Sequence, residues 1–196
     1  MRSALSSLKL ERPRSLAAAL GALHQSVANE RLIPLAGGTD LYVYLNAGTL
    51  AGRRFLDLTP LAEIGGIRPR RDGVTIGALA TFREIRTHPV LRRRFPTLAA
   101  AAAEVGGWQI QSRATLAGNV ANASPAGDSL PVLLALDAVV RVQSVRGARA
   151  IPFDRLYRGY RQLDLAPIDD IRSDREYRMT VAGNLIEQFL RAARSA

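Results

Sequence analysis

The sequence predicts an α+β fold with a small βαβ lobe, then a mixed lobe of antiparallel sheet and helices, and finally a C-terminal helix. A strand, a tight turn, a helix and a second strand are indicated in that order between residues 31 and 58. Further along, two stretches alternate apolar and polar residues around a turn signal, which is typical of antiparallel hairpins. The chain has 196 residues, 47% of them apolar, which is enough for a core of ordinary domain size. We expect lobes at 1–60 and 61–167 and a closing helix within 168–196.

The first lobe opens with a helix that Ser15 is expected to cap. The run RLIPLA (31–36) is a strand candidate, and its Pro34 favours the edge of a sheet because proline cannot donate to a central ladder. The run TDLYVYLNAG (39–48) is a short helix that ends at a glycine, and RFLDL (54–58) is the next strand. Strand, helix and strand in this order predict a parallel pairing.

Two hairpins are predicted in the second lobe. The first occupies 67–78, with Asp72–Gly73 as its turn signal. The second occupies 138–153 and turns at Arg146–Gly147. These hairpins predict an antiparallel sheet in this lobe.

Helices are expected between and after the hairpins. Thr81 is expected to cap one that stops before Pro89, and an alanine-rich helix follows at 95–107. The segment 173–194 is interpreted as a terminal helix, because apolar residues recur every four positions. These residues are Tyr177, Val181, Leu185 and Phe189. An exposed stripe of this kind would favour a homo-oligomer.

The composition removes several kinds of chemistry. The chain has no cysteine, which excludes disulfides, thiolate nucleophiles and iron–sulfur clusters or zinc held by cysteine. Lys9 is the only lysine, and His24 and His88 are the only histidines, so no catalytic residue and no metal site is expected. No apolar run is long enough to span a membrane, and the N-terminus lacks the apolar core of a signal peptide. A cytoplasmic location is compatible with these features.

The formal charge of +10 comes almost wholly from arginine. A strong positive charge raises the question of nucleic acid. The arginines are scattered along the chain, however, and no basic stripe alternates with aromatic residues. Because the planar guanidinium group also suits protein interfaces and phosphate groups, the pattern favours a protein or nucleotide partner over nucleic acid.

Two loops carry the candidate site. The first is AGGTD (36–40), whose glycine pair lets the backbone approach a ligand closely beside a helix start. Thr39 could donate a hydroxyl, while Asp40 would cap the helix or bind a hydroxyl. A plain tight turn explains this loop equally well, because it matches neither G-x-G-x-x-G nor a Walker loop.

The second loop belongs to TLAGNVANASPAGDSLPVLLALDA (115–138), which is rich in small polar residues between apolar runs. Gly118 and Asn119 are expected in a turn, with Thr115, Asn119 and Ser124 as donors. Asp128 could accept from a sugar hydroxyl. A loop that satisfies its own hydrogen bonds is the alternative. Two such loops in one small chain favour a nucleotide site.

The sequence resembles the FAD-binding subunit of the molybdenum hydroxylases, the xanthine dehydrogenase and carbon monoxide dehydrogenase family. PLAGGTDLYVYL resembles the first flavin loop of this family, and VTIGALATFREI its "IGA-x-T" segment. QIQSRATLAGNVANASPAGDSLPVLLALDAVV resembles the second flavin loop, and FDRLYRGYRQLDLAP follows in the expected place. The four matches occur in family order between residues 35 and 167.

The resemblance implies an FAD whose pyrophosphate lies between the two loops. The implied cofactor-binding residues are Leu35, Ala36, Gly37, Gly38, Thr39, Asp40, Thr115, Ala117, Gly118, Asn119, Ser124 and Asp128. The implied function is an oxidoreductase flavoprotein subunit that passes electrons between iron–sulfur clusters on a partner and an acceptor such as NAD. The implied partners are a molybdenum-cofactor subunit and a 2Fe-2S subunit.

Three departures from the family pattern support an alternative, a flavin-less scaffold or interaction module of the same family. Ala117–Gly118 replaces a usual glycine pair, and Gln111–Ser112 replaces an arginine and an asparagine. The third subdomain of the family is expected to be largely missing after Pro167, with only the closing helix retained. A flavin ring would then be exposed or covered by a partner.

Overall fold

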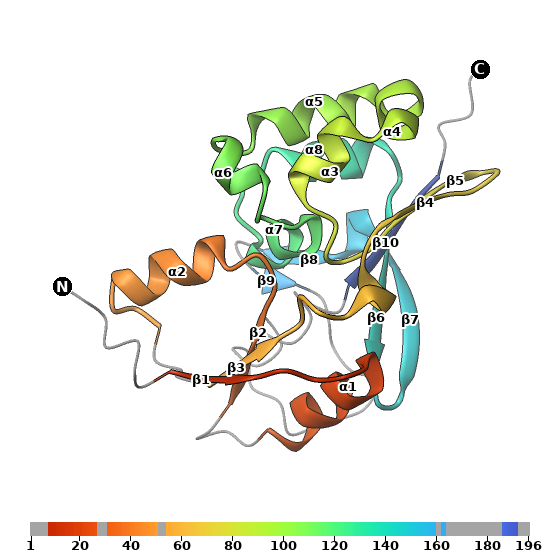
Figure 1. Cartoon of the computed structure of the whole chain (residues 1–196). Helices are drawn as coiled ribbons and strands as arrows, with labels where there is room; N and C mark the ends of the chain where they lie inside the picture. Colours follow the sequence, from red (N-terminus) through yellow and green to blue (C-terminus); the bar gives the residue numbers. More distant parts are fainter. Residues whose placement is uncertain (1–7, 27–30, 51–53, 160–161, 164–185, 192–196) are drawn as a thin grey trace.

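The computed structural model describes residues 8–26, 31–50, 54–159, 162–163 and 186–191. It confirms the predicted fold class, with a lobe built on a parallel sheet followed by a lobe of antiparallel sheet and helices (Figure 1). The strands are β1 (Lys9–Glu11), β2 (Leu32–Leu35), β3 (Arg54–Asp57), β4 (Ile67–Pro69), β5 (Gly73–Ile76), β6 (Val139–Ser144), β7 (Gly147–Pro152), β8 (Tyr157–Gly159), β9 (Gln162–Leu163) and β10 (Ile186–Arg191). The α-helices are α1 (Leu16–Gln25), α2 (Thr39–Asn46), α3 (Phe82–Thr87), α4 (Pro89–Arg94), α5 (Pro96–Glu104), α6 (Trp108–Gln111), α7 (Leu116–Asn122) and α8 (Ser129–Ala135).

The N-terminal sheet has the strand order β1-β3-β2, and both pairings are parallel. The predicted βαβ unit is therefore confirmed, and so is the edge position of the strand that contains Pro34. Strand β1 was not predicted, because three residues are too few to show a periodicity. Ser15 caps α1 as expected, since its hydroxyl accepts from the Ala18 N–H at 3.1 Å.

Asp57, at the end of β3, is a buried carboxylate with several donors. Arg12 Nε donates to its Oδ2 at 3.0 Å, and the Thr59 N–H donates to its Oδ1 at 3.0 Å, together with the Thr59 hydroxyl. Burial raises the pKa of Asp57, but the hydrogen bonds from Thr59 and Arg12 outweigh it and hold the pKa below its ordinary value. The ionised carboxylate therefore stabilises the turn that follows β3.

Asp57→Asn is expected to destabilise the chain at pH 7 by about 1–2 kcal/mol and by less at pH 3, which lies below the ordinary aspartate pKa of 3.8. A lowered pKa means that this stabilisation is complete above the unfolded-state pKa and is lost as the pH falls through the folded-state pKa. Urea unfolding at both pH values measures the difference. Asp72→Asn, in the exposed turn of the first hairpin, is the control. An equal loss for Asp57→Asn at both pH values would contradict the prediction.

The larger sheet has the order β4-β5-β10-β6-β7. Its outer pairs, β4 with β5 and β6 with β7, are the two predicted antiparallel hairpins. The predicted terminal helix is wrong over Ile186–Arg191, which form β10, antiparallel to both β5 and β6. A strand here hydrogen-bonds to the facing edges of both hairpins, and this outweighs the local helical pattern. The rest of the predicted helix, including Tyr177, Val181 and Leu185, lies outside the described residues.

Helices cover the larger sheet and complete the core. Helix α5 contacts α3, α4 and α8, and these helices gather at the top of Figure 1. Thr81 caps α3 in a capping box with Glu84, and Pro89 begins the separate helix α4. Among the largest fully buried side chains are Ile76, Phe82, Leu98, Leu116 and Leu133. No helix in the described part of the chain is long and apolar enough to cross a membrane.

Candidate functional site

The first loop, Ala36 to Gly38, connects β2 to α2. Gly38 has a φ of +75° and occupies the N-cap of α2, a left-handed conformation that favours glycine. Asp40 was one candidate for the cap, but the structure places it in the first turn of the helix, and Gly38 occupies the N-cap. The first turn of a helix leaves N–H groups without intrahelical acceptors and carries the positive end of the helix dipole.

The second loop is more helical than predicted. Gly118 and Asn119 lie in α7, not in a turn, because Thr115 caps this helix by accepting from the Gly118 N–H at 3.1 Å. The Asn119 Oδ1 accepts from the hydroxyl of Ser129, a fully buried residue, at 2.7 Å. The Thr115 cap and the hydrogen bond between Asn119 and Ser129 together hold α7 against α8.

The two loops meet backbone to backbone at Gly37. A Cβ built at this position would lie 2.0 Å from the Arg113 carbonyl oxygen and 3.0 Å from the Ala114 Cα. Only glycine allows this approach. A second link joins the flanking helices, because the Tyr44 hydroxyl donates to the Asn122 Oδ1 at 3.0 Å.

A groove of about 450 Å³ lies where the loops meet, a volume within the range of small-molecule and cofactor sites. Eight of the twelve predicted site residues line it: Ala36, Gly37, Gly38, Thr39, Asp40, Thr115, Gly118 and Asn119. The other four predicted residues, Leu35, Ala117, Ser124 and Asp128, are not among its lining residues. Ala117 is buried in the core, so its methyl group does not obstruct the groove.

The sequence interpretation missed the apolar wall of the groove. This wall includes Leu41, Val43, Leu50, Val105 and Ile110, together with the buried residues Ile33 and Phe82. In the sequence such residues look like core positions. Only the structure distinguishes groove residues from core residues. Helix α2 has no buried residue, and Val43 and Ile110 are 59% and 41% exposed. Exposed apolar side chains along a groove are typical of a surface that a ligand covers.

The polar part of the groove holds one carboxylate, Asp40, and no lysine or arginine among the described lining residues. A phosphate here would therefore be held by backbone N–H groups and the α2 dipole rather than by side-chain cations. The glycine contact at Gly37, the first turn of α2 and the apolar wall together fit a cofactor with a pyrophosphate and flat rings.

Comparison with known proteins agrees with this geometry. Residues 6–172 match the family described as "FAD binding domain in molybdopterin dehydrogenase". The chain is 34% identical over 164 residues to the nicotinate dehydrogenase FAD-subunit of Eubacterium barkeri, covering 83% of this chain and 55% of that protein. It is 28% identical over 147 residues to the carbon monoxide dehydrogenase medium chain of Hydrogenophaga pseudoflava, covering 75% of this chain and 50% of that one. The chain thus spans about half the length of these curated relatives.

Solved structures show the same fold. A carbon monoxide dehydrogenase from Hydrogenophaga pseudoflava, which lacks the Mo-pyranopterin moiety of its cofactor, superposes with a TM-score of 0.81 at 24% identity, covering 96% of this chain and 60% of that one. Quinoline 2-oxidoreductase from Pseudomonas putida 86 superposes with a TM-score of 0.81 at 21% identity. The superposition covers 95% of this chain and 60% of that one. The resemblance found in the sequence is thereby confirmed, and the chain belongs to the family of FAD-binding domains of molybdopterin dehydrogenases.

Proposed function

We propose that this chain binds FAD in the groove between its two loops and serves as the flavoprotein component of a molybdenum hydroxylase. The observation that carries the proposal is the meeting of the loops at Gly37, which brings segments far apart in the sequence to one groove. When bound, the flavin supplies the electron-transfer chemistry. The chain's own residues hold and orient the cofactor, which is consistent with a groove whose described lining contains no histidine or lysine.

Each part of the groove has a role in this proposal. Gly37, Gly38 and the first turn of α2 offer backbone N–H groups to the pyrophosphate, with Thr39 as a hydroxyl donor. Asp40 is best suited to accept from a sugar hydroxyl, since a carboxylate beside a phosphate would repel it. The apolar wall excludes water from a flat ring.

The partners follow from the family. The proposal assigns this chain to a complex with a molybdenum-cofactor subunit and a 2Fe-2S subunit. In this complex the chain passes electrons between the iron–sulfur clusters of the partner and an acceptor such as NAD. Relatives named as subunits of nicotinate and carbon monoxide dehydrogenases support this assignment. The lobe boundaries near residues 60 and 167, a cytoplasmic location and a homo-oligomer stay part of the proposal.

Saturating FAD is expected to stabilise the chain by about 3 kcal/mol when its concentration is a hundred times the dissociation constant. Thermal unfolding with added FAD measures this, and a visible spectrum of the purified chain shows whether flavin co-purifies. Riboflavin is the control ligand, because it has the flavin ring but no pyrophosphate. We expect it to stabilise much less, since the loops would have nothing to hold.

The same experiment distinguishes FAD binding from the alternative, a flavin-less scaffold. No flavin absorbance and no shift of the melting temperature with FAD would favour the scaffold. FAD bound one to one by the isolated chain would exclude it.

A further inference from the structure

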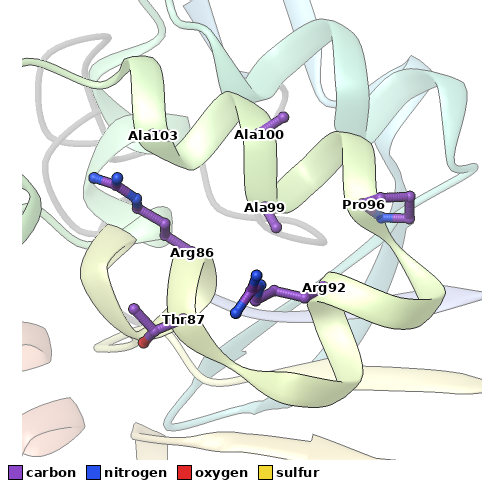
Figure 2. Close-up of a pocket in the computed structure, with 7 residues that line it drawn as sticks. All are labelled: Arg86, Thr87, Arg92, Pro96, Ala99, Ala100 and Ala103. Atoms are coloured by element: carbon purple, nitrogen blue, oxygen red, sulfur yellow. The ribbon is translucent and has the colours of Figure 1, made fainter.

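A second groove lies between α5 and the pair α3–α4, with a volume of about 470 Å³. Its lining residues are Arg86, Thr87, Arg92, Pro96, Ala99, Ala100 and Ala103. Figure 2 shows the two arginine side chains in the space between these helices, with Ala99 of α5 near Arg92. Among these described lining residues there are two cations and no acid, so the groove is positively charged.

The Arg86 side chain is oriented by a hydrogen bond to a buried residue. Gln111, only 2% exposed, accepts from the Arg86 Nη1 at 3.0 Å. The Gln111 Nε2 in turn donates to the carbonyl oxygens of Ala103 at 2.8 Å and Gly106 at 3.2 Å. Because a buried amide orients this guanidinium group, it loses less side-chain entropy when it pairs with a ligand.

Arg92 is available to a ligand. Its side chain is exposed and makes no hydrogen bond or ion pair with the described residues. The alanines on α5 leave room for backbone and small side chains to approach the helix between the two guanidinium groups. Two cations beside a floor of methyl groups match a peptide segment with carboxylates and small apolar side chains.

We propose that this arginine groove, formed by Arg86, Arg92 and the alanine face of α5, docks an acidic segment of a partner protein chain. Protein is favoured over nucleic acid because the described lining of this groove contains no aromatic side chain on which a base could stack.

The position of the arginine groove relates docking to electron transfer, and this relation rests on the proposed function. Helix α6 separates the two grooves, since Ile110 lines the loop groove while Gln111, the next residue, holds Arg86. A partner seated on the arginine groove thus lies across one short helix from the flavin groove. Acidic segments of the electron-donating subunit are the occupants that this placement favours.

The test measures binding of a fluorescein-labelled peptide of alternating glutamate and alanine to the whole chain by fluorescence anisotropy. Removing both groove cations in Arg86→Gln/Arg92→Gln is expected to weaken binding by about tenfold. The matched control is Arg70→Gln/Arg71→Gln, which removes the same charge from the exposed turn of the first hairpin. It should change the affinity by less than about twofold. Arg92→Gln alone, which breaks no hydrogen bond among the described residues, keeps the test valid if the Arg86 variant folds poorly.

Three outcomes would overturn the docking proposal. Equal losses in the groove and control variants would mean unspecific attraction to a basic protein. Tighter binding of oligothymidylate of equal charge, with the same dependence on Arg86 and Arg92, would assign the groove to nucleic acid. Displacement of the peptide by millimolar phosphate at constant ionic strength would make it a small-anion site. Each titration is run with and without FAD, so peptide binding without any flavin binding would uphold docking while the proposed function fails.

Discussion

Gly37→Ala is expected to destabilise the chain by about 3 kcal/mol or more and to abolish FAD binding. The added Cβ would lie 2.0 Å from the Arg113 carbonyl oxygen, and backbone on that side cannot rotate away as a side chain can. The two loops must therefore move apart, which widens the groove at the place proposed for the pyrophosphate. Urea unfolding and FAD titration by fluorescence quenching measure the two effects.

Gly21→Ala is the matched control, because a Cβ there has no heavy atom within 4 Å and the residue lies inside α1. It should stabilise the chain by up to about 1 kcal/mol, since alanine favours helix more than glycine does. Normal FAD affinity in a stable Gly37→Ala protein would show that the contact of the loops is irrelevant to the cofactor.

Gln111→Leu is expected to lower the free energy of unfolding by about 1–3 kcal/mol, the second large effect that we expect. Leucine has a similar size, so little cavity forms. The carbonyl oxygens of Ala103 and Gly106 lose the donor that the buried Gln111 supplies, and Arg86 loses its acceptor. The loop between α5 and α6 loosens as a result.

Gln109→Leu is the control for this change, because Gln109 lies on the same short helix and is exposed. It should alter the unfolding free energy by less than about 0.5 kcal/mol. Similar midpoints in urea for the two variants would mean that the buried amide contributes no more than a surface one.

Much of the fold could be predicted because local signals and tertiary structure agree. Ser15 and Thr81 were predicted to cap helices and do so in the structure, and Pro34 lies on an edge strand as predicted. The glycines at 37 and 38 predicted a close approach of the backbone to a ligand, whereas the contact of Gly37 with the Arg113 carbonyl could not be read from the sequence. Contacts between distant segments leave no local signal.

The errors have the same origin. Residues 186–191 carry a helical pattern, yet two hairpin edges separated by more than sixty positions in sequence require a strand between them. Gly118 and Asn119 favour a turn by composition, but capping by Thr115 sets a helix there. The apolar wall of the loop groove was missed because a residue such as Val43 looks the same in sequence whether it packs in a core or lines a groove.

Helix α2 has no fully buried residue, although the Tyr44 hydroxyl links it to Asn122. A helix of this length gains too little from its own hydrogen bonds to persist alone in water. A ligand in the groove that α2 borders would add contacts to this helix, so ligand binding and the local stability of α2 are coupled. On the proposed function, the chain without FAD would hold α2 more weakly, and local opening of this helix would make it more accessible to proteases.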